Sequence, residues 1–330
     1  MTQSRIVTLT MNPAVDVATS VPQVISDRKM RCGPPELDPG GGGINVARVI
    51  HRLGGDVLAL STSGGSTGSL LEELLAREGV PHLAFPIRER TRENLNVREE
   101  SSGRQFRFVL PGPAVSAIEW RRCLRAVTEL DPFPEFLVAS GSLPPGVPTD
   151  FYASLARLAR ERGSLLVVDA SGEPLRGALD AGVYLFKPSI AEFRSLTGRP
   201  AAEEEELALL ARDLVRSGRS HAVVLSLGAG GTLWVSETEA ERLSAPAVPV
   251  LAGVGAGDSL VAGVVLGLAR GLRISQAMRY GLAAATASVM NAGTRLCRAE
   301  DVERLLPSVC GAAIRGLDER TACSPAAAAV

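Results

Sequence analysis

Short apolar and β-branched segments alternate along this chain with segments whose apolar residues recur at helical spacing. The predicted strands are residues 5–10, 56–61, 136–140, 164–170, 183–188 and 222–228. The predicted helices are residues 44–53, 67–78, 149–162, 203–217, 258–270 and 275–290. The alternation predicts an α/β fold with a mainly parallel central sheet and helices on both faces. Ligands of such folds bind beyond the carboxyl ends of the strands, where several polar or glycine-rich segments of this sequence fall.

Two segments, residues 15–38 and 88–112, interrupt this alternation, because they have a strand-like pattern and no predicted helix. Two interpretations are open. The segments form a small sheet beside the main one, or they are ordinary surface hairpins. A small sheet would hide its edges and its apolar face by closing over a cleft or by pairing with a second chain. Both segments carry basic residues, namely Lys29, Arg31, Arg92, Arg98, Arg104 and Arg107.

The composition excludes several classes of function. A net charge of −1 provides no basic field for nucleic acid. No apolar run reaches transmembrane length, and the first residues lack the apolar core of a signal peptide, so we expect a soluble cytoplasmic protein. The five cysteines and three histidines have no metal-ligand spacing, so any chemistry falls to carboxylates, lysines and backbone amides.

The length bounds the domain organisation. A chain of 330 residues is long enough for one large α/β domain or for two smaller ones. We predict a single domain over residues 1–311, with the two β segments inserted in it. Residues 312–330 end in small residues and are predicted to be a disordered tail.

Four consecutive glycines, Gly40–Gly43, stand just before the first predicted helix, with Asn45 at its start. Glycine lets a ligand approach the main chain closely, and four glycines are entropically costly in a mere turn, so we predict that the run binds a ligand. It is not a P-loop, because GxxxxGK[ST] is absent, and it is not a convincing dinucleotide fingerprint. Asp16 and Ser142 each come after a predicted strand and are candidates for hydrogen bonds to a sugar, with turn-capping as the alternative for Asp16.

Two further segments follow predicted strands. The segment "SLGAGG", residues 226–231, presents backbone amides suited to the phosphates or ribose of a nucleotide. In "FKPSIAE", Lys187 suits a phosphate and Glu192 suits a hydrated magnesium ion. Taken singly, each segment is equally well explained by a structural role.

The segment "AGVGAGDSLVAG", residues 252–263, places Asp258 where a glycine turn leads into a predicted helix. Outward-pointing amides make such a turn an anion site, so a carboxylate there needs an explanation. A phosphoryl group in transit provides one, because the amides of residues 255–257 would stabilise it while Asp258 takes the proton of the attacking hydroxyl. The alternative is that Asp258 caps the helix. Together with the glycine run and the basic β segments, the pattern favours a kinase.

The motifs "GGGGINVAR" and "GVGAGDSLVAG" resemble those of the PfkB (ribokinase-like) family of carbohydrate kinases, and the resemblance spans nearly the full chain. The segments "TRENLNV", "QFRFVLPG", "GSLPPGV" and "NAGTRLC" are similar to the 6-phosphofructokinases of this family. The resemblance implies a Rossmann-like ribokinase fold with a small β-sheet lid, formed by the two inserted segments, through which a homodimer assembles. It implies a glycolytic enzyme that phosphorylates fructose 6-phosphate at its 1-hydroxyl with ATP and Mg²⁺. Tagatose-6-phosphate kinase, 1-phosphofructokinase and a catalytically inactive sugar-phosphate-binding protein remain as alternatives.

The resemblance also implies roles for individual residues. Asp258 matches the catalytic base, and Gly255, Ala256 and Gly257 match the anion hole. The positions that match sugar contacts are Asp16, Gly41, Gly42, Asn45 and Ser142, and those that match ligands of the substrate's phosphate are Lys29, Arg31 and Arg92. The positions that match nucleotide contacts are Lys187, Ser226, Gly228, Gly230, Gly231, Leu282 and Thr286. Glu192 matches a magnesium ligand acting through water, and a potassium site in relatives, built largely from backbone carbonyls, matches Ala252, Val254, Asn291, Gly293 and Arg295.

Two positions depart from the family pattern. Ser189 stands where the family has asparagine in Asn-x-x-Glu, and it lacks the amide that would orient water on magnesium. Gly253 stands where a threonine is common before the glycine turn, which loosens that loop. Neither departure removes the predicted base or the anion hole.

Overall fold

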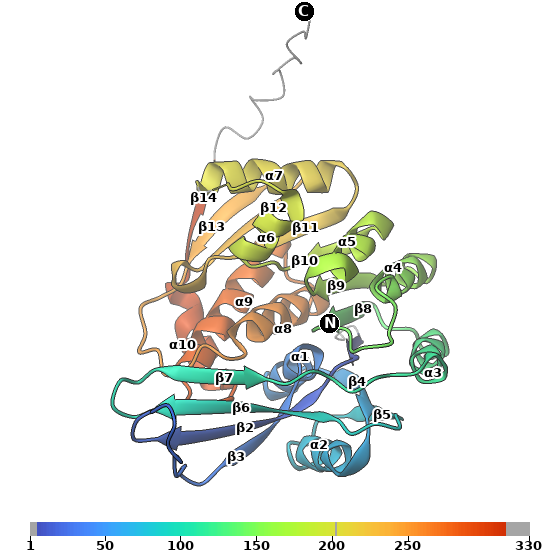
Figure 1. Cartoon of the computed structure of the whole chain (residues 1–330). Helices are drawn as coiled ribbons and strands as arrows, with labels where there is room; N and C mark the ends of the chain where they lie inside the picture. The colour runs from blue at the N-terminus through green and yellow to red at the C-terminus, as the bar shows by residue number, and fades with distance from the viewer. Residues whose placement is uncertain (1–4, 202, 315–330) are drawn as a thin grey trace, which may run out of the picture.

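A parallel sheet with crossover helices forms the centre of the molecule. In the computed structural model, which describes residues 5–314 apart from residue 202, this sheet is ten-stranded. In spatial order its strands are β14 (Cys310–Ala313), β13 (Ala240–Ser244), β12 (Thr232–Ser236), β11 (Ser220–Ser226), β10 (Val183–Phe186), β9 (Leu165–Asp169), β8 (Phe136–Ser140), β1 (Ile6–Thr10), β4 (Val57–Ser63) and β5 (His82–Pro86). Neighbours from β11 to β5 are parallel, and β12, β13 and β14 extend the sheet antiparallel. The predicted fold class is confirmed (Figure 1).

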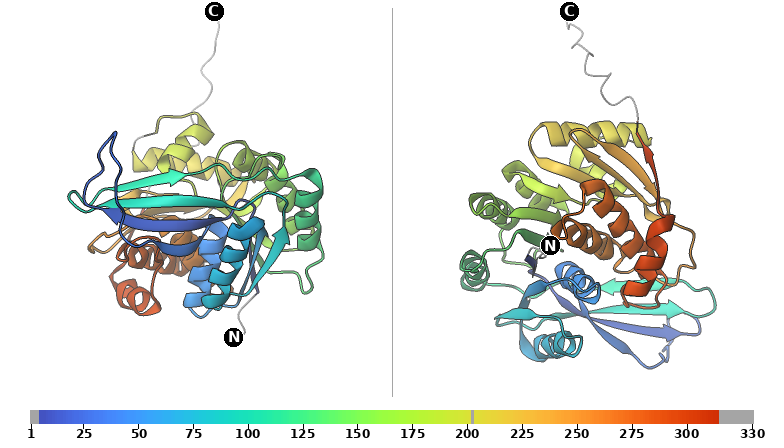
Figure 2. Two further views of the ribbon diagram at one scale, coloured as in Figure 1. Left: turned by 60° about the horizontal axis from the view of Figure 1, so that its bottom comes forward. Right: turned by 180° about the vertical axis from the view of Figure 1, so that it is seen from behind.

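Helices cover both faces of this sheet (Figure 2). One core lies under α1 (Gly42–Arg52), α2 (Gly65–Arg77), α8 (Ala256–Ala269), α9 (Ile274–Val289) and α10 (Ala299–Leu305). The other core lies under α3 (Ala117–Thr128), α4 (Phe151–Glu161), α5 (Gly172–Ala181), α6 (Ile190–Thr197) and α7 (Glu204–Arg216). Alternate residues of each strand pack into the two cores, because successive side chains of a strand point to opposite faces. In β8, Phe136 and Val138 belong to the first core, and Leu137 and Ala139 to the second.

The two inserted segments form one small sheet, which we call the lid. Its strands, in spatial order, are β3 (Glu36–Gly40), β2 (Ala14–Val21), β6 (Arg92–Glu99) and β7 (Gln105–Val109). The central pair, β2 and β6, is parallel and in register from Ala14 opposite Arg92 to Val21 opposite Glu99. Segments far apart in the sequence therefore pair directly, so the interpretation as separate surface hairpins is wrong. Figure 1 shows the lid beside the main sheet.

Each of the predicted strands and helices is present, with ends shifted by a few residues. The sequence analysis missed α3, α5, α6 and α10, the strands β5, β12, β13 and β14, and two short 3₁₀ turns, η1 (Gly228–Gly230) and η2 (Leu306–Ser308). The predicted boundary at residue 312 is wrong, because β14 continues to Ala313 and pairs with β13. Residues 315–330 of the predicted tail lie outside the described residues. Within the part of the chain that the structure describes, no helix has both the length and the apolar composition to cross a bilayer.

Candidate active site

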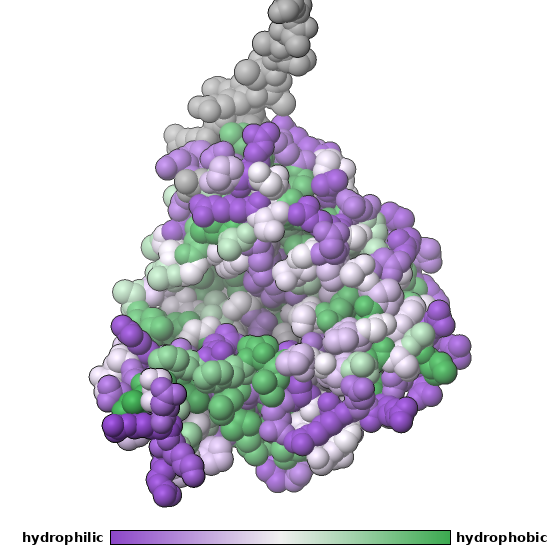
Figure 3. Space-filling model, viewed as in Figure 1, coloured by the Kyte–Doolittle hydropathy of each residue, from purple (hydrophilic) through white to green (hydrophobic). Residues whose placement is uncertain are grey.

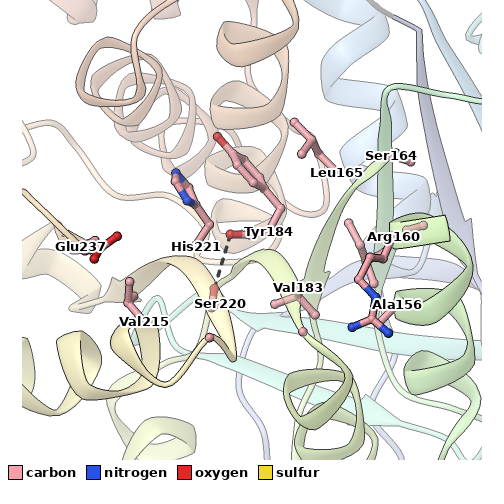
Figure 4. A pocket seen from close by; sticks show the side chains of 14 residues that line it. Ala156, Arg160, Ser164, Leu165, Val183, Tyr184, Val215, Ser220, His221 and Glu237 are labelled. Carbon is pink, nitrogen blue, oxygen red and sulfur yellow. Dashed lines mark hydrogen bonds between the residues drawn. The ribbon is translucent and has the colours of Figure 1, made fainter. Parts of the chain in front are cut away.

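Two cavities lie at opposite ends of the parallel strands. The larger, about 580 Å³, opens at the amino ends of β9, β10 and β11, beside the stacked rings of Tyr184 and His221 (Figure 4). No residue that the sequence analysis selected lines it. The smaller, about 430 Å³, opens at the carboxyl ends of the strands, between the lid and the start of α8. Because the predicted chemistry gathers there, the smaller cavity is the candidate active site.

The cavity wall brings together most of the residues predicted for catalysis and sugar binding. From the prediction it contains Asp16, Gly41, Gly42, Asn45, Arg92, Ser142, Lys187, Glu192, Val254, Gly255, Gly257 and Asp258. It also contains residues that the prediction missed, namely Asn94, Arg107, Val109, Ser140, Gly141, Asp169, Ala170 and Ser171. Gly253, which departs from the family pattern, lies in the wall as well. A Cβ on Gly253 would contact nothing within 4 Å, so there is open space for a larger side chain at this position.

Asp258 lies in the first turn of α8, three residues after Gly255, whose φ of 77° is in the left-handed region. No side chain caps this helix, so the interpretation of Asp258 as a helix cap is wrong. Its Oδ2 instead accepts a hydrogen bond of 2.9 Å from Nδ2 of Asn45. Burial raises the pKa of Asp258 to about 6, and the nearby charge of Asp169 acts in the same direction. A carboxylate with such a pKa is ionised at neutral pH and is still a useful proton acceptor.

Lys187 faces Asp258 across the cavity and is paired with a carboxylate that the prediction missed. Its Nζ lies 3.2 Å from Oδ1 of Asp169, the last residue of β9. Burial alone would lower the pKa of Lys187, but the charges of Asp169 and Asp258 outweigh it and raise this pKa. The ammonium therefore stays charged, and it lies close to the anion-hole turn, because a Cβ on Gly257 would come within 3.3 Å of Nζ.

The lid supplies the opposite wall. Asp16 of β2 accepts a hydrogen bond of 2.9 Å from Nδ2 of Asn94 on β6, and burial raises its pKa. Arg92 of β6 donates to the carbonyl oxygens of Leu110 and Asn12, at 2.9 and 3.0 Å, while its buried Nε has no hydrogen-bond partner among the described residues. Arg107 on β7 adds a second guanidinium to this wall.

The glycine run packs tightly against the ends of β1, β8 and β2. A Cβ on Gly40 would come within 2.6 Å of the carboxyl group of Asp16, and a Cβ on Gly42 within 2.2 Å of Oγ of Ser140. A Cβ on Gly43 would come within 2.5 Å of Oγ1 of Thr10. The run is therefore required by close packing, and it also exposes the main chain of Gly41 and Gly42 to the cavity.

The predicted nucleotide contacts fall into two groups. Ser226, at the end of β11, forms a parallel bridge with Ser189, which joins the segment of residues 226–231 to the segment that carries Lys187 and Glu192. Gly228 and Gly230 are exposed and Gly231 is buried, and none of the three lines the cavity. Leu282 and Thr286 are buried in α9, where Oγ1 of Thr286 donates to the carbonyl oxygen of Leu282, and they do not line the cavity either.

Ser189 has a structural role that the sequence analysis missed. Its Oγ accepts a hydrogen bond from the backbone nitrogen of Glu192 at 3.2 Å, and Oε2 of Glu192 accepts one from the backbone nitrogen of Ser189 at 2.7 Å. This reciprocal capping box starts α6 and sets Glu192 in the cavity wall. Over the residues that the structure describes, no group of three or more His, Cys, Asp or Glu side chains is arranged to hold a metal directly. Glu192 therefore stays a predicted magnesium contact that would act through water.

Two predicted groups lie outside the cavity wall, except that Val254 of the second group is part of it. Lys29 and Arg31 are exposed in the loop between β2 and β3. The predicted potassium ligands belong to two adjacent segments, because Leu251 and Ala252 donate backbone hydrogen bonds to the carbonyl oxygen of Val289. The side chain of Asn291 is bonded to Ala287, and that of Arg295 to Glu36. Because these two side chains already have hydrogen-bond partners, the two segments could bind a monovalent cation only through backbone carbonyl oxygens.

Comparison with known proteins gives a consistent result. The family model described as pfkB family carbohydrate kinase matches residues 2–301. ATP-dependent 6-phosphofructokinase isozyme 2 of Mycobacterium tuberculosis H37Rv is 45% identical over 300 residues, which cover 91% of this chain and 88% of that protein. The isozyme 2 of Escherichia coli K12 is 41% identical over 302 residues, covering 91% and 97% of the two proteins.

A solved structure agrees with these relatives. The crystal structure of phosphofructokinase-2 from Escherichia coli in complex with potassium matches with a TM-score of 0.88 at 40% identity, and covers 92% of this chain and 99% of that one. The family model spans most of the chain, and the fold and motifs agree with it. The chain therefore belongs to the pfkB family of carbohydrate kinases.

Proposed function

We propose that this protein is an ATP-dependent 6-phosphofructokinase, which converts fructose 6-phosphate to fructose 1,6-bisphosphate. The observation that carries the proposal is the cavity itself: Asp258 and the 255–257 turn lie at one wall, and Arg92 and Arg107 lie at the lid wall opposite. A sugar phosphate held by two guanidiniums at one end would present its far hydroxyl to a carboxylate at the other. The relatives named above carry the same activity in their names.

In the proposed reaction, Asp258 takes the proton of the 1-hydroxyl while that oxygen attacks the γ-phosphorus of ATP. The bond between the γ-phosphorus and the bridging oxygen breaks, and ADP leaves with the electron pair. The amides of Gly255, Ala256 and Gly257 stabilise the charge on the transferred group. Lys187 binds phosphate oxygens of the nucleotide. Magnesium, when bound with ATP, neutralises phosphate charge, and Glu192 would hold one of its waters.

The substrate and the location are proposed in the same way. Tagatose 6-phosphate and fructose 1-phosphate would satisfy the same phosphate clamp, so they are the competing substrates. Potassium is the proposed occupant of the carbonyl site formed by Ala252, Val254, Asn291, Gly293 and Arg295, since the related structure was solved with that ion. The proposed location is the cytoplasm, where ATP and sugar phosphates are available.

Steady-state kinetics with MgATP and each of the three sugar phosphates test the function. We expect the highest kcat/KM for fructose 6-phosphate. A preference for either of the others would reassign the substrate. A protein that binds these sugars in calorimetry but turns over none of them would be a binding protein and not a kinase.

The variant Asp258→Asn tests the base. We expect kcat to fall at least about a hundredfold while the affinity for fructose 6-phosphate stays near that of the unmodified protein, because general-base catalysis contributes about 10²–10⁴-fold. Asp150→Asn is the matched control, since Asp150 is exposed and its side chain makes no cap hydrogen bond. Retention of more than about a tenth of kcat by Asp258→Asn would contradict a base of this strength.

We also propose a homodimer that assembles through the lid. The register places Leu37, Val17, Leu95 and Phe108 side by side on the lid face that points away from the cavity. Figure 3 shows hydrophobic side chains gathered over the lid strands. Leu37, Leu95 and Phe108 are 40%, 38% and 53% exposed, and a second lid would cover them. Lys29 and Arg31 stay predicted phosphate ligands, and from their exposed loop they would act through lid movement or in the cavity of the second copy.

A further inference from the structure

Asn45 connects the proposed base to a buried arginine. Its Nδ2 donates to Oδ2 of Asp258 at 2.9 Å, and its Oδ1 accepts from Nη1 of Arg48 at 3.3 Å. An arginine side chain has only donors, so the oxygen of the amide must face Arg48. The NH₂ group must then face Asp258. The orientation of this amide is therefore decided by Arg48.

Arg48 is itself held rigidly. It is fully buried in α1, one turn after Asn45, and Nη1 also donates to the carbonyl oxygen of Pro39 at 2.8 Å. Nη2 lies 3.1 Å from Asp38 of the lid strand β3, and both Nε and Nη2 bond to Glu78 beyond α2. Burial raises the pKa of Glu78, but the hydrogen bonds and charges of Arg48 and Arg52 together outweigh it and lower this pKa, so Glu78 keeps its charge. A planar guanidinium bonded on all sides cannot turn without breaking several charged hydrogen bonds.

We propose that Arg48 is a positioning residue of the phosphoryl transfer, which locks the Asn45 amide with its donor toward Asp258 and so keeps the base ionised. This inference rests on the proposed function. The motif GGGGINVAR ends at Arg48, but the sequence analysis assigned this residue no role, and it does not line the cavity. Its hydrogen bond to Asn45 is its route to Asp258, while its charge also opposes the rise in the pKa of Asp16.

The electrostatic surroundings of Asp258 explain why this lock matters. Asp258 faces the charges of Asp169 on β9, Asp16 on β2 and Lys187 after β10, besides the amide of Asn45. Burial and the two carboxylates raise its pKa, and Asn45 and Lys187 oppose that rise. If the amide turned over, its oxygen would face the carboxylate and disfavour the charged form. The pKa of Asp258 would rise further, and less base would be ionised at neutral pH.

The test is the pH profile of kcat for Arg48→Met, measured from about pH 5.5 to 9 after kinase activity of the unmodified protein has been established. We expect the acidic limb to move by about one unit to higher pH, with kcat about tenfold lower on that limb and close to the unmodified value at pH 9. Arg48→Lys keeps the positive charge in the core but cannot bond Asn45, Pro39 and Asp38 together, so we expect it to fold and to show a shift in the same direction.

Glu78→Gln is the control, because it weakens the ion pair of Arg48 and leaves the contact with Asn45. We expect Glu78→Gln to have a lower Tm, and we expect the acidic limb of its kcat profile to lie at the same pH as in the unmodified protein. A loss of kcat in both Arg48 variants that is the same at every pH would overturn the inference, as would an equal shift in Glu78→Gln. NMR titration of the Asp258 carboxyl carbon, whose signal is assigned by its loss in Asp258→Asn, measures the same shift in pKa without requiring turnover. An unmodified protein that shows no kinase activity would therefore overturn the proposed function alone.

Discussion

At the scale of single residues, three buried aspartates of the site differ in their partners. Burial raises the pKa of Asp16, Asp169 and Asp258, yet Asp169 is paired with Lys187 and Asp16 with Asn94. Asp16 and Asp258 each accept a hydrogen bond from an asparagine amide, but of these three carboxylates only Asp258 lies in the first turn of α8, beside the anion-hole turn. The sequence predicted Asp16 and Asp258. Asp169 also lies near the end of a predicted strand. Because ligands of such folds bind beyond the carboxyl ends of the strands, the sequence could have identified it as a site residue.

Arg92 provides a residue-scale prediction. Its Nη groups are bound to main-chain carbonyls, its buried Nε has no partner among the described residues, and the side chain lines the cavity. We expect Arg92→Ala to raise KM for the sugar phosphate at least about tenfold with a small change in kcat, because a hydrogen bond to a charged group contributes about 1.5–3 kcal/mol. Steady-state kinetics measure both constants. Arg98→Ala, at the exposed far end of β6, is the control, and an unchanged KM in Arg92→Ala would remove Arg92 from the clamp.

At the scale of elements, the ends of helices place the reactive groups. The start of α8 holds Asp258, and the start of α6 holds Glu192. The helix α6 was missed although "SIAE" has the serine and glutamate of a capping box, and "SAIE" at the start of α3 has the same pattern. The helix α6 has only eight residues, so its start signal was better evidence than its apolar pattern, whereas α3 has twelve residues and could have been found from either.

The cap of α6 gives the prediction at this scale. We expect Ser189→Ala to lower the free energy of unfolding by about 1 kcal/mol, because the helix loses the acceptor for a backbone N–H. Thermal unfolding would show a decrease in Tm of about 2 °C, and amide exchange of residues 190–197 would accelerate. Ser189→Asn is the matched variant, since asparagine caps helices equally well. Equal Tm and exchange in Ser189→Ala and the unmodified protein would show that the cap is not needed.

At the scale of the whole molecule, the site exists because two sheets meet. The main sheet delivers Lys187 and Asp169, and the lid delivers Asp16 and Arg92. Gln105 of β7 also donates to the carbonyl oxygen of Leu251 at 2.9 Å, which links the lid to the loop before the anion hole. The alternation of side chains across the lid puts polar groups on the cavity side and apolar groups on the other side.

The apolar side of the lid carries the prediction on assembly. We expect Phe108→Asp to weaken the proposed dimer, with a rise in the dissociation constant of at least about tenfold, because each copy loses a buried aromatic side chain worth about 1.5–3 kcal/mol. Light scattering after size-exclusion chromatography measures the mass. Ile118→Asp is the control, since Ile118 is 73% exposed on α3 and lies outside the lid. A monomeric unmodified protein, or a dimer that Phe108→Asp leaves intact, would exclude the lid as the interface.

The sequence by itself determined the α/β class, the strands and helices with strong periodicity, and the two motifs that carry Asp258 and Asn45, because these depend on local spacing and on residue type. Only the tertiary structure decided that β2 and β6 pair across the chain, that Asp169 holds Lys187, and that Arg48 fixes Asn45. Those facts depend on distances between segments that folding brings together. A single sequence contains no direct measure of such distances, so the motif that ends at Arg48 gave no sign that this side chain contacts Asn45, Asp38 and Glu78.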